Sequence, residues 1–317
     1  MGSTHCTLTD RIGAHECNPT RGPFTDGTLD VSRHLRKGVH STFGMAICQV
    51  DKDQSPQKVD GSAVYTGQWL GEMRHGQGVQ EWPDGSWLEG QWALDVVQGR
   101  ARFEQACGNV YDGDWFDNRA HGFGIYIQTD GSRYEGQWRK DLQHGSGIET
   151  WLDGARFQGL YFEGAKSGAG HFRWPDGSRY DGEFASGSIS GRGSYTWADG
   201  RTYTGQWEDN TMNGAGSYTW PEGRSYIGEF LKDEKHGRGI YRWDSGLEYA
   251  GDFVQGRMHG EGLLTFQDGH EEASRWEDGV RIRDKEDEMS SIAEADGDAD
   301  AAANAAQQLH EDAIVDV

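Results

Sequence analysis

Hydrophobic and polar residues alternate with a period of two in short runs, and these runs recur every 23 residues through most of the chain. Every run except the second, which begins with Leu88, opens with an aromatic residue, followed by a glycine two positions later and a second aromatic residue two positions after that, as in Tyr203, Gly205 and Trp207. Because successive side chains of a β-strand point to opposite faces, these three residues share one face. The leading glycines keep their spacing without an insertion: Gly67, Gly90, Gly113, Gly136, Gly159, Gly182, Gly205, Gly228 and Gly251.

The second half of each 23-residue unit carries two further glycines, except in the second copy, where Ala101 replaces the last of them; a histidine often precedes the pair, as in His236, Gly237 and Gly239. Alternation then resumes, and most units close on an Asp-Gly pair such as Asp199-Gly200. Asp-Gly between alternating runs is a strong hairpin signal, because glycine adopts the positive φ that the turn requires. Each unit therefore predicts a strand, a loop, a strand and a tight turn, with strands of about 5–6 residues and no room for a helix.

The nine units lie in one register from Tyr65 to Gly269, which indicates that each hairpin stacks on the next. We expect three parts. Residues 1–60 form an N-terminal segment that is partly disordered or caps the first repeat. Residues 61–283 form the repeat array, with nine full repeats and a degenerate half repeat. Residues 284–317 form an acidic, disordered tail, in which Ala301 to Ile314 favours a short helix.

Composition and charge restrict the class of function. The chain has 48 glycines and 13 tryptophans, and only 34% of its residues are hydrophobic, which fits many turns and thin layers rather than a large globular core. The formal net charge is −22, and the tail alone holds eleven acidic residues against Lys285. A chain this acidic is a poor candidate for non-specific nucleic-acid binding, because Lys and Arg supply the affinity for phosphates. We expect no secretory signal or membrane-spanning stretch, and the four cysteines have no disulfide or zinc spacing, which favours a cytoplasmic protein.

The pattern Tyr-x-Gly-x-Trp followed by His-Gly-x-Gly-x-x-x-Trp-x-Asp-Gly resembles the MORN (membrane occupation and recognition nexus) repeat family over about two thirds of the chain. The resemblance implies an all-β fold, an elongated single-layer antiparallel sheet of tandem hairpins. Similar proteins are found at membrane contacts, basal bodies, cell-division structures and ciliary axonemes, some are proposed to bind phosphoinositides, and they tend to dimerise through terminal repeats. The second copy departs most, at Leu88, Gln98 and Cys107.

The second aromatic residue of each unit forms a ladder along the sheet. The ladder first serves to fill the space between hairpins, and a groove left partly open along it would bind an apolar helix or an acyl chain. The candidate groove residues are Trp69, Trp92, Trp115, Trp138, Tyr161, Phe184, Trp207, Phe230 and Phe253.

The other repeated residues favour structural roles. The histidines before the second glycine are at least 23 residues apart and are absent from four copies, so we interpret them as turn residues rather than as metal ligands. The Asp-Gly acids are turn residues that bind their own backbone. The glycines lack the context of a phosphate loop. We therefore predict no catalytic residue, no metal and no cofactor.

Two features could bring the chain to a membrane. Met1-Gly2 with Cys6 suggests myristate on Gly2 and palmitate on Cys6, which together would give a stable anchor. A basic cluster of Arg133, Arg139 and Lys140 is the candidate site for a lipid headgroup.

The repetition of every informative residue predicts a long binding surface rather than an active site. The leading hypothesis is a non-catalytic scaffold or tether that binds protein partners at a membrane–cytoskeleton junction, at the cortex, a basal body or an axoneme. Homodimers through terminal repeats and peripheral membrane contact are further expectations. One alternative is an axonemal, radial-spoke-like component. Another is a phosphoinositide-binding or lipid-kinase-related module, although neither flank has the length of a kinase domain.

Overall fold

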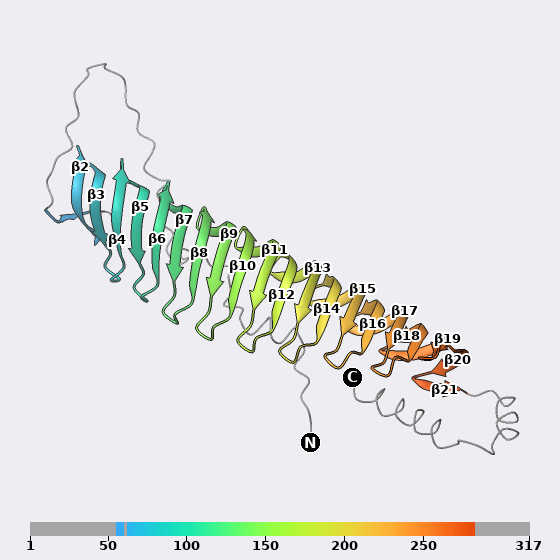
Figure 1. Cartoon of the computed structure of the whole chain (residues 1–317). Helices are drawn as coiled ribbons and strands as arrows, with labels where there is room; N and C mark the ends of the chain where they lie inside the picture. The colour runs from blue at the N-terminus through green and yellow to red at the C-terminus, as the bar shows by residue number, and fades with distance from the viewer. Residues whose placement is uncertain (1–54, 60–61, 283–317) are drawn as a thin grey trace, which may run out of the picture. The chain divides into compact units, whose positions relative to one another are not determined.

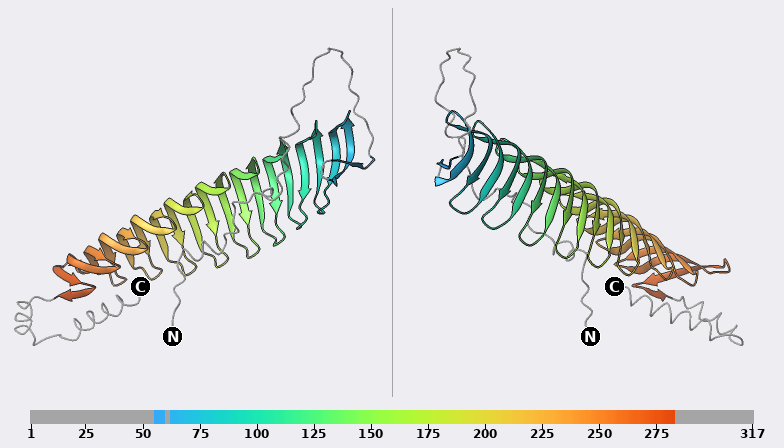
Figure 2. Two further views of the ribbon diagram at one scale, coloured as in Figure 1. Left: turned by 180° about the vertical axis from the view of Figure 1, so that it is seen from behind. Right: turned by 60° about the vertical axis from the view of Figure 1, so that its left-hand side comes forward.

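The computed structural model describes residues 55–59 and 62–282, and the regular structure of these residues is almost entirely β-strand, with no α-helix (Figure 1). The strands are linked in sequence order into one antiparallel sheet of consecutive hairpins, which two further views show in Figure 2. The predicted all-β class and hairpin order are confirmed.

The two strands of a repeat differ in length. The first strand has seven residues in β2 (Val64–Leu70), β4 (Trp87–Ala93), β6 (Val110–Phe116), β8 (Arg133–Arg139), β10 (Arg156–Phe162), β12 (Arg179–Ala185), β14 (Thr202–Glu208), β16 (Ser225–Leu231), β18 (Glu248–Val254) and β20 (Glu271–Glu277). The second has nine in β3 (Met73–Glu81), β5 (Val96–Glu104), β7 (Arg119–Ile127), β9 (Leu142–Thr150), β11 (Ala165–Arg173), β13 (Ser188–Thr196), β15 (Thr211–Thr219), β17 (Glu234–Arg242) and β19 (Arg257–Thr265). The sheet also contains β1 (Gln57–Lys58), which pairs with β2, and β21 (Val280–Ile282).

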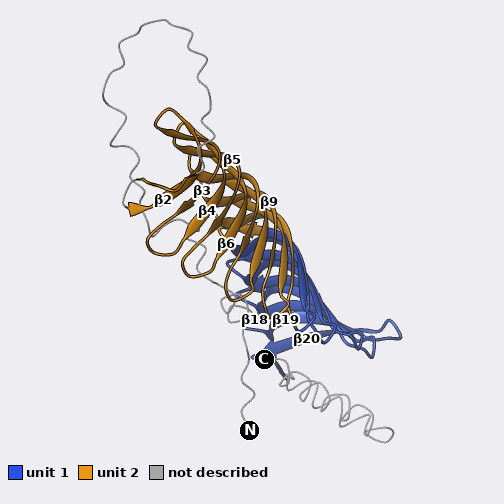
Figure 3. Ribbon diagram, turned by 90° about the vertical axis from the view of Figure 1, so that its left-hand side faces the viewer, with its two compact units in different colours: residues 1–12, 176–183, 188–317 blue, residues 13–175, 184–187 orange. Residues whose placement is uncertain are grey.

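The chain divides into two compact units, which Figure 3 colours separately. Unit 2 comprises residues 13–175 and 184–187, and unit 1 comprises residues 1–12, 176–183 and 188–317. In the described part of the chain, β1 to β11 lie in unit 2 and β13 to β21 lie in unit 1. The same hairpin is repeated within each unit.

One face of the sheet is an aromatic core, here called the aromatic face. In β14, Tyr203 and Trp207 are buried, while Thr204 and Glu208 between and beyond them are exposed. Gly205 lies between the two rings and pairs with Gly216 of β15. A Cβ on Gly205 would lie 2.6 Å from the Cα of Gly216 and would overlap the phenol of Tyr203. Glycine is therefore required at both positions, because the tyrosine ring lies directly over them.

The two strands of a repeat are joined by a two-residue turn rather than by the expected loop. In the seventh repeat, Asp209 and Asn210 have φ values of 44° and 67°. Positive φ at both central positions is the signature of a type I′ turn, whose twist matches that of the flanking strands. The turn is short, and this leaves more residues for the strands than the sequence predicted.

The glycines of the second half lie inside a strand at a β-bulge. Gly214 has a φ of 87°, and the pairing of β14 with β15 shifts between Gly205 and Trp207. The Oε1 atom of Gln206 accepts the backbone N–H of Ala215 at 2.9 Å, so the side chain satisfies a donor that the bulge frees. The expected loop at these glycines is wrong, because the bulge absorbs the positive φ without ending the strand.

The Asp-Gly turns form as predicted. In the sixth repeat, the N–H of Gly200 donates to the carbonyl of Trp197 at 3.0 Å, and Gly200 has a φ of 93°. The Oδ1 atom of Asp199 accepts the N–H of Arg201 at 3.1 Å. This is a three-residue hairpin loop with a glycine bulge, and the aspartate stabilises it through its own backbone.

Successive repeats are also joined at their type I′ turns. The N–H of Asn210 donates to the carbonyl of Ile189 at 2.9 Å, and the Oδ1 atom of Asn210 accepts the N–H of Ile189 at 2.7 Å. Equivalent side-chain bonds are made by Asp95, Asn118, Asp141 and Asp233. The second turn residue thus extends the hydrogen-bonding ladder from one hairpin to the next.

Candidate interaction surface

The predicted groove residues all lie in the core. Their exposed fractions run from 2% to 8% for Trp69, Trp92, Trp115, Trp138, Tyr161, Phe184, Trp207, Phe230 and Phe253. Their rings meet tyrosines edge to face: Tyr203 has centroid distances of 5.0 Å to Trp207 of its own repeat and 5.0 Å to Phe230 of the next. Each ring is enclosed by neighbouring repeats, so these nine side chains contribute to the core.

Several of the aromatic residues also form hydrogen bonds through their polar ends within the core. The hydroxyl of Tyr203 donates to the carbonyl of Gln206 at 2.8 Å, and the indole N–H of Trp207 donates to the carbonyl of Gly193 at 3.2 Å. Burial raises the pKa of the core tyrosines, for example that of Tyr65 to about 12. These phenols therefore stay protonated and act as fixed donors, which suits a structural role rather than proton transfer.

The fifth copy departs from the repeat on the aromatic face. In the fifth copy Phe157 stands in the tyrosine position, and the hydroxyl of Tyr161 donates to Glu149 at 2.9 Å. The ammonium of Lys166 lies 3.1 Å from the same carboxylate and 5.0 Å from the ring centre of Trp151. All these groups are within unit 2. In other repeats a buried tyrosine hydroxyl donates to a backbone carbonyl, whereas here the hydroxyl of Tyr161 donates to the carboxylate of Glu149. The ammonium of Lys166 balances the charge of that carboxylate.

The face opposite the aromatic core carries exposed apolar side chains in unit 2. Phe116 in β6 is 58% exposed, Phe123 in β7 is 46% exposed, and Leu160 and Phe162 in β10 are 43% and 57% exposed. We call these four residues the phenylalanine patch. Exposed aromatic side chains of this size are typical of the anchors of protein–protein interfaces.

Two histidines of the repeat border the phenylalanine patch. The ring of His121 lies 5.8 Å from that of Phe116, and the ring of His144 lies 5.5 Å from that of Phe162. Both histidines lie within nine-residue strands, so their interpretation as turn residues is wrong. Each histidine directly precedes the glycine at which the strand bulges. Among the residues that the structure describes, no group of three His, Cys, Asp or Glu side chains could hold a metal ion.

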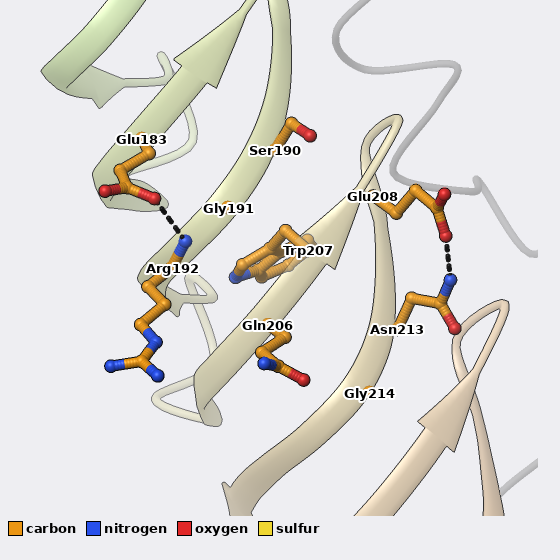
Figure 4. A pocket seen from close by; sticks show the side chains of 9 residues that line it. All are labelled: Glu183, Ser190, Gly191, Arg192, Gln206, Trp207, Glu208, Asn213 and Gly214. Atoms are coloured by element: carbon orange, nitrogen blue, oxygen red, sulfur yellow. Dashed lines mark hydrogen bonds between the residues drawn. The ribbon is translucent and has the colours of Figure 1, made fainter.

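A shallow open pocket of about 830 Å³ lies on the opposite face of unit 1 (Figure 4). It is lined by Glu183, Ser190, Gly191, Arg192, Gln206, Trp207, Glu208, Asn213 and Gly214. Ser190 and Asn213 occupy the histidine position of the repeat, and the smaller side chains leave the space. Glu183 accepts the backbone N–H of Arg192 at 2.8 Å, and Asn213 donates to Glu208. The carboxylates are engaged in these bonds, and the pocket has the composition of an open polar surface.

The predicted basic cluster is not brought together. Arg133 begins β8, whereas Arg139 ends it and Lys140 lies in the turn that follows. The length of the strand therefore separates Arg133 from the other two residues by roughly 20 Å. Arg133 is also paired with Glu135 at 2.6 Å. The sequence reasoning missed a closer pair: Arg156 and Arg173 are direct cross-strand partners on the opposite face of β10 and β11.

The membrane predictions have two further outcomes. Gly2 and Cys6 lie outside the described residues. In the described part of the chain, the structure contains no helix with the length and apolar character needed to span a bilayer.

The phenylalanine patch was not among the residues singled out from the sequence. A usable signal exists: alternation places the residue before and the residue after the second aromatic position on the opposite face. The residue before is polar in every copy except the fifth, where it is Leu160, and the residue after is aromatic only in the third and fifth copies, at Phe116 and Phe162. The candidate residues were chosen at positions where the same residue type recurs in most copies, and Phe116, Leu160 and Phe162 do not follow such a pattern.

The solved structures similar to this chain are distant. The TCP10 domain of Danio rerio CPAP is 8% identical, with a TM-score of 0.36, over 73% of this chain and 100% of that chain. The TCP domain of Drosophila melanogaster SAS-4, in complex with a proline-rich motif of Ana2, is 10% identical, with a TM-score of 0.14, over 75% and 96%. Identities and TM-scores this low support no statement about function. No curated protein matches the sequence.

The family comparison is specific. The model described as "MORN repeat" matches residues 65–87, 111–133, 134–156, 157–179, 180–200, 203–223, 226–248 and 249–271, more than half of the chain. Residues 88–110, the copy with the off-pattern Leu88, Gln98 and Cys107, are not matched by the model. Their strands β4 and β5 nevertheless form the same kind of hairpin as the other repeats. The chain belongs to the MORN repeat family.

Proposed function

We propose that this chain is a non-catalytic scaffold whose protein partners bind the phenylalanine patch on the face opposite the aromatic core. Its MORN repeats indicate a repeat-based protein-binding module. The observation that carries the proposal is the exposure of Phe116 and Phe162 by 58% and 57% in a unit whose other aromatic rings are mostly buried. Phenylalanine has only two side-chain torsions, so burying such a ring in an interface costs little side-chain freedom.

The patch has enough apolar surface to anchor a partner. Covering the exposed half of one phenylalanine removes roughly 100 Å² from water, which contributes about 2–3 kcal/mol. Phe116 and Phe162 lie at the same repeat position two repeats apart, with Arg139 at that position in the repeat between them. A partner with two apolar groups and an acidic residue between them would complement both the rings and this arginine.

The experiment compares the neighbours of the tagged full-length protein with those of Phe116→Asp/Phe162→Asp by proximity labelling in its own cell. Ala185→Asp is the matched control, because Ala185 is exposed, occupies the same repeat position and lies outside the patch. We expect a set of proteins that the double variant loses and the control keeps, and purified members of that set should bind wild type and not the double variant. Identical neighbours in all three proteins would reject the patch as the binding surface.

The proposed location is a membrane–cytoskeleton junction in the cytoplasm, which the places where similar MORN proteins are found support. The location of the tagged chain tests this. Signal at the cell cortex or a basal body agrees with a tether, whereas signal along the axoneme favours the alternative of a radial-spoke-like component. Homodimerisation through terminal repeats belongs to the same proposal, and light scattering of the purified chain measures it.

The membrane contact is proposed to be peripheral, through lipidated Gly2 and Cys6 or through a protein partner. Labelling with a myristate analogue tests the first route, and an unlabelled wild-type chain would exclude it. The lipid-binding alternative is tested by flotation with phosphoinositide liposomes. The best candidate for a headgroup site is the pair Arg156 and Arg173. Salt-sensitive flotation that is abolished in Arg156→Glu and retained in Arg139→Glu would favour a lipid-binding module.

A further inference from the structure

Five aliphatic side chains form a row across β16 to β20 on the face opposite the aromatic core of unit 1. Each is the direct Cα partner of the next, in the order Ile227, Ile240, Ala250, Leu263 and Ala273. Ile227 is 58% exposed, Ile240 is 41% exposed and Leu263 is 37% exposed. We call these five residues the aliphatic row. Contiguous exposed apolar surface is typical of interaction sites.

The continuity of the aliphatic row is local: in unit 2, Ile125 stands at the repeat position of Ile240, but its cross-strand partners are Asp112 and Glu135. In β13 to β15 the same position is filled by Ser194, Thr204 and Ser217, and the hydroxyls of Ser194 and Thr204 lie 2.9 Å apart. Ser217 is the direct Cα partner of Ile227, so the surface changes from polar to aliphatic between two adjacent strands. The hairpin folds equally with either kind of side chain, and the aliphatic residues are therefore not required by the fold.

We propose that residues 301–314 of the same chain fold as a helix on the aliphatic row. The described chain ends at β21, next to this part of the sheet. The 18 residues from 283 to 300 can span up to roughly 60 Å when extended. Five strand spacings, from β21 back to β16, amount to about 24 Å. The segment therefore reaches every residue of the row, at the high local concentration that a short tether provides.

The composition of the segment fits an uncharged apolar surface. Residues 301–310 contain no Asp, Glu, Lys or Arg, in a tail that is otherwise strongly acidic. The segment is rich in alanine, the best helix former. In a helix, Ala302, Ala306, Leu309 and Ala313 lie on one stripe. This stripe is about 17 Å long, close to the roughly 19 Å of the row's four spacings, and its small side chains allow a close approach.

Two arginines beside the row are paired with carboxylates. Arg242 lies 2.5 Å from Glu248, and Arg238 lies 3.7 Å from Asp252. An acidic ligand would have to compete with these carboxylates for the arginines, whereas residues 301–310 carry no acidic side chain and the segment's two acids, Glu311 and Asp312, lie near its end. This favours residues 301–314 over the more acidic residues 284–300 as the occupant of the row.

The first test places a photo-cross-linking residue in the full-length protein, as Ile240→p-benzoylphenylalanine. The same substitution at Ser217, which has the same repeat position in a polar part of the face, is the control. We expect a cross-link within one chain between position 240 and a peptide from residues 301–317, and none from position 217. A cross-link between two copies would show that a second chain covers the row, and the absence of a cross-link to the tail would equally overturn the proposal.

The second test measures amide hydrogen exchange in residues 301–314 of the full-length protein. We expect exchange in wild type to be slowed at least about tenfold, and Leu309→Asp to remove this protection. Asn304→Asp adds the same charge on the opposite side of the helix and should keep it. Ile240→Asp should also remove the protection, since that side chain is exposed and its loss leaves the sheet folded. Unprotected amides in wild type, or equal losses in both tail variants, would refute the docking.

The two proposals fail separately. The aliphatic row lies in unit 1 and the phenylalanine patch in unit 2, so an undocked tail leaves the scaffold proposal as it stands, and an unused patch leaves the tail proposal as it stands.

Discussion

Asp141 is a turn residue whose charge opposes folding. Its Oδ1 atom accepts the N–H of Ala120 at 2.7 Å, and its own N–H donates to the carbonyl of Ala120 at 3.0 Å. Asn118 and Asn210 occupy the same repeat position, and their Oδ1 atoms accept an equivalent N–H at 2.7 Å. An uncharged amide therefore performs the same structural role. We expect Asp141→Asn to keep both hydrogen bonds and to remove the charge.

The size of the effect follows from the pKa of Asp141, which burial raises from 3.8 to about 6, against the lowering effects of the Ala120 hydrogen bond and Arg119. The folded state binds the proton more tightly than the unfolded state. Stability is therefore highest below the unfolded pKa and falls as the pH rises toward the folded pKa. Two pKa units correspond to about 3 kcal/mol at most, and partial exposure with solvent screening reduces the expected effect to about 1–2 kcal/mol.

The assay is urea unfolding followed by tryptophan fluorescence at pH 4.0 and pH 7.5. Asp141→Asn should raise the unfolding free energy at pH 7.5 by about 1–2 kcal/mol and change it little at pH 4.0. Asn210→Asp is the reverse control, with the expected loss at pH 7.5 and little loss at pH 4.0. Equal effects at the two pH values would show that the amide acts through packing rather than through charge. A destabilised Asp141→Asn would refute the reasoning.

Two further predictions concern the aromatic face. Gly193→Ala should destabilise the chain by at least about 3 kcal/mol in the same assay, because its Cβ would overlap the phenol of Tyr180; Gly177→Ala, which adds a Cβ in open space at a positive φ, should cost about 1 kcal/mol. Glu149→Leu should cost about 2–3 kcal/mol by leaving Lys166 unpaired, and adding Lys166→Met should recover part of that loss. Additive losses in the second pair would show that the two residues are not coupled.

The repeat register and the closing turn could be predicted because their residues have few alternatives. A glycine beneath a tyrosine ring has no substitute, so the 23-residue spacing of Gly205 and its equivalents survives in every copy. Asp199-Gly200 has the two residue types that favour this turn. Where the geometry permits a single residue type, the sequence pattern carries the structure directly.

The type I′ turns could not be predicted, because the residues there do not share a type. Lys140 and Asp141 both have positive φ, as do Asp209 and Asn210, and none of them is a glycine. The twist of the flanking strands and the hydrogen bonds to the preceding repeat stabilise this conformation, and neither is visible in a window of sequence. The strand through the bulge was missed for a related reason: a glycine with positive φ reads as a turn unless a side chain such as Gln206 is known to satisfy the freed N–H.

The candidate surfaces were missed because repetition and function point to different residues in this fold. The aromatic ladder recurs in every copy because each hairpin must bury it, so recurrence identifies the core. A residue on the opposite face is not needed by the hairpin, and serine at position 217 and isoleucine at position 240 are accepted in neighbouring strands. A row of aliphatic side chains at positions that the hairpin leaves free therefore needs an explanation other than folding. Contact with a second segment, which would remove this apolar surface from water, is the explanation that we propose. In a repeat protein, the departures from the pattern at unconstrained positions are therefore the residues to test first.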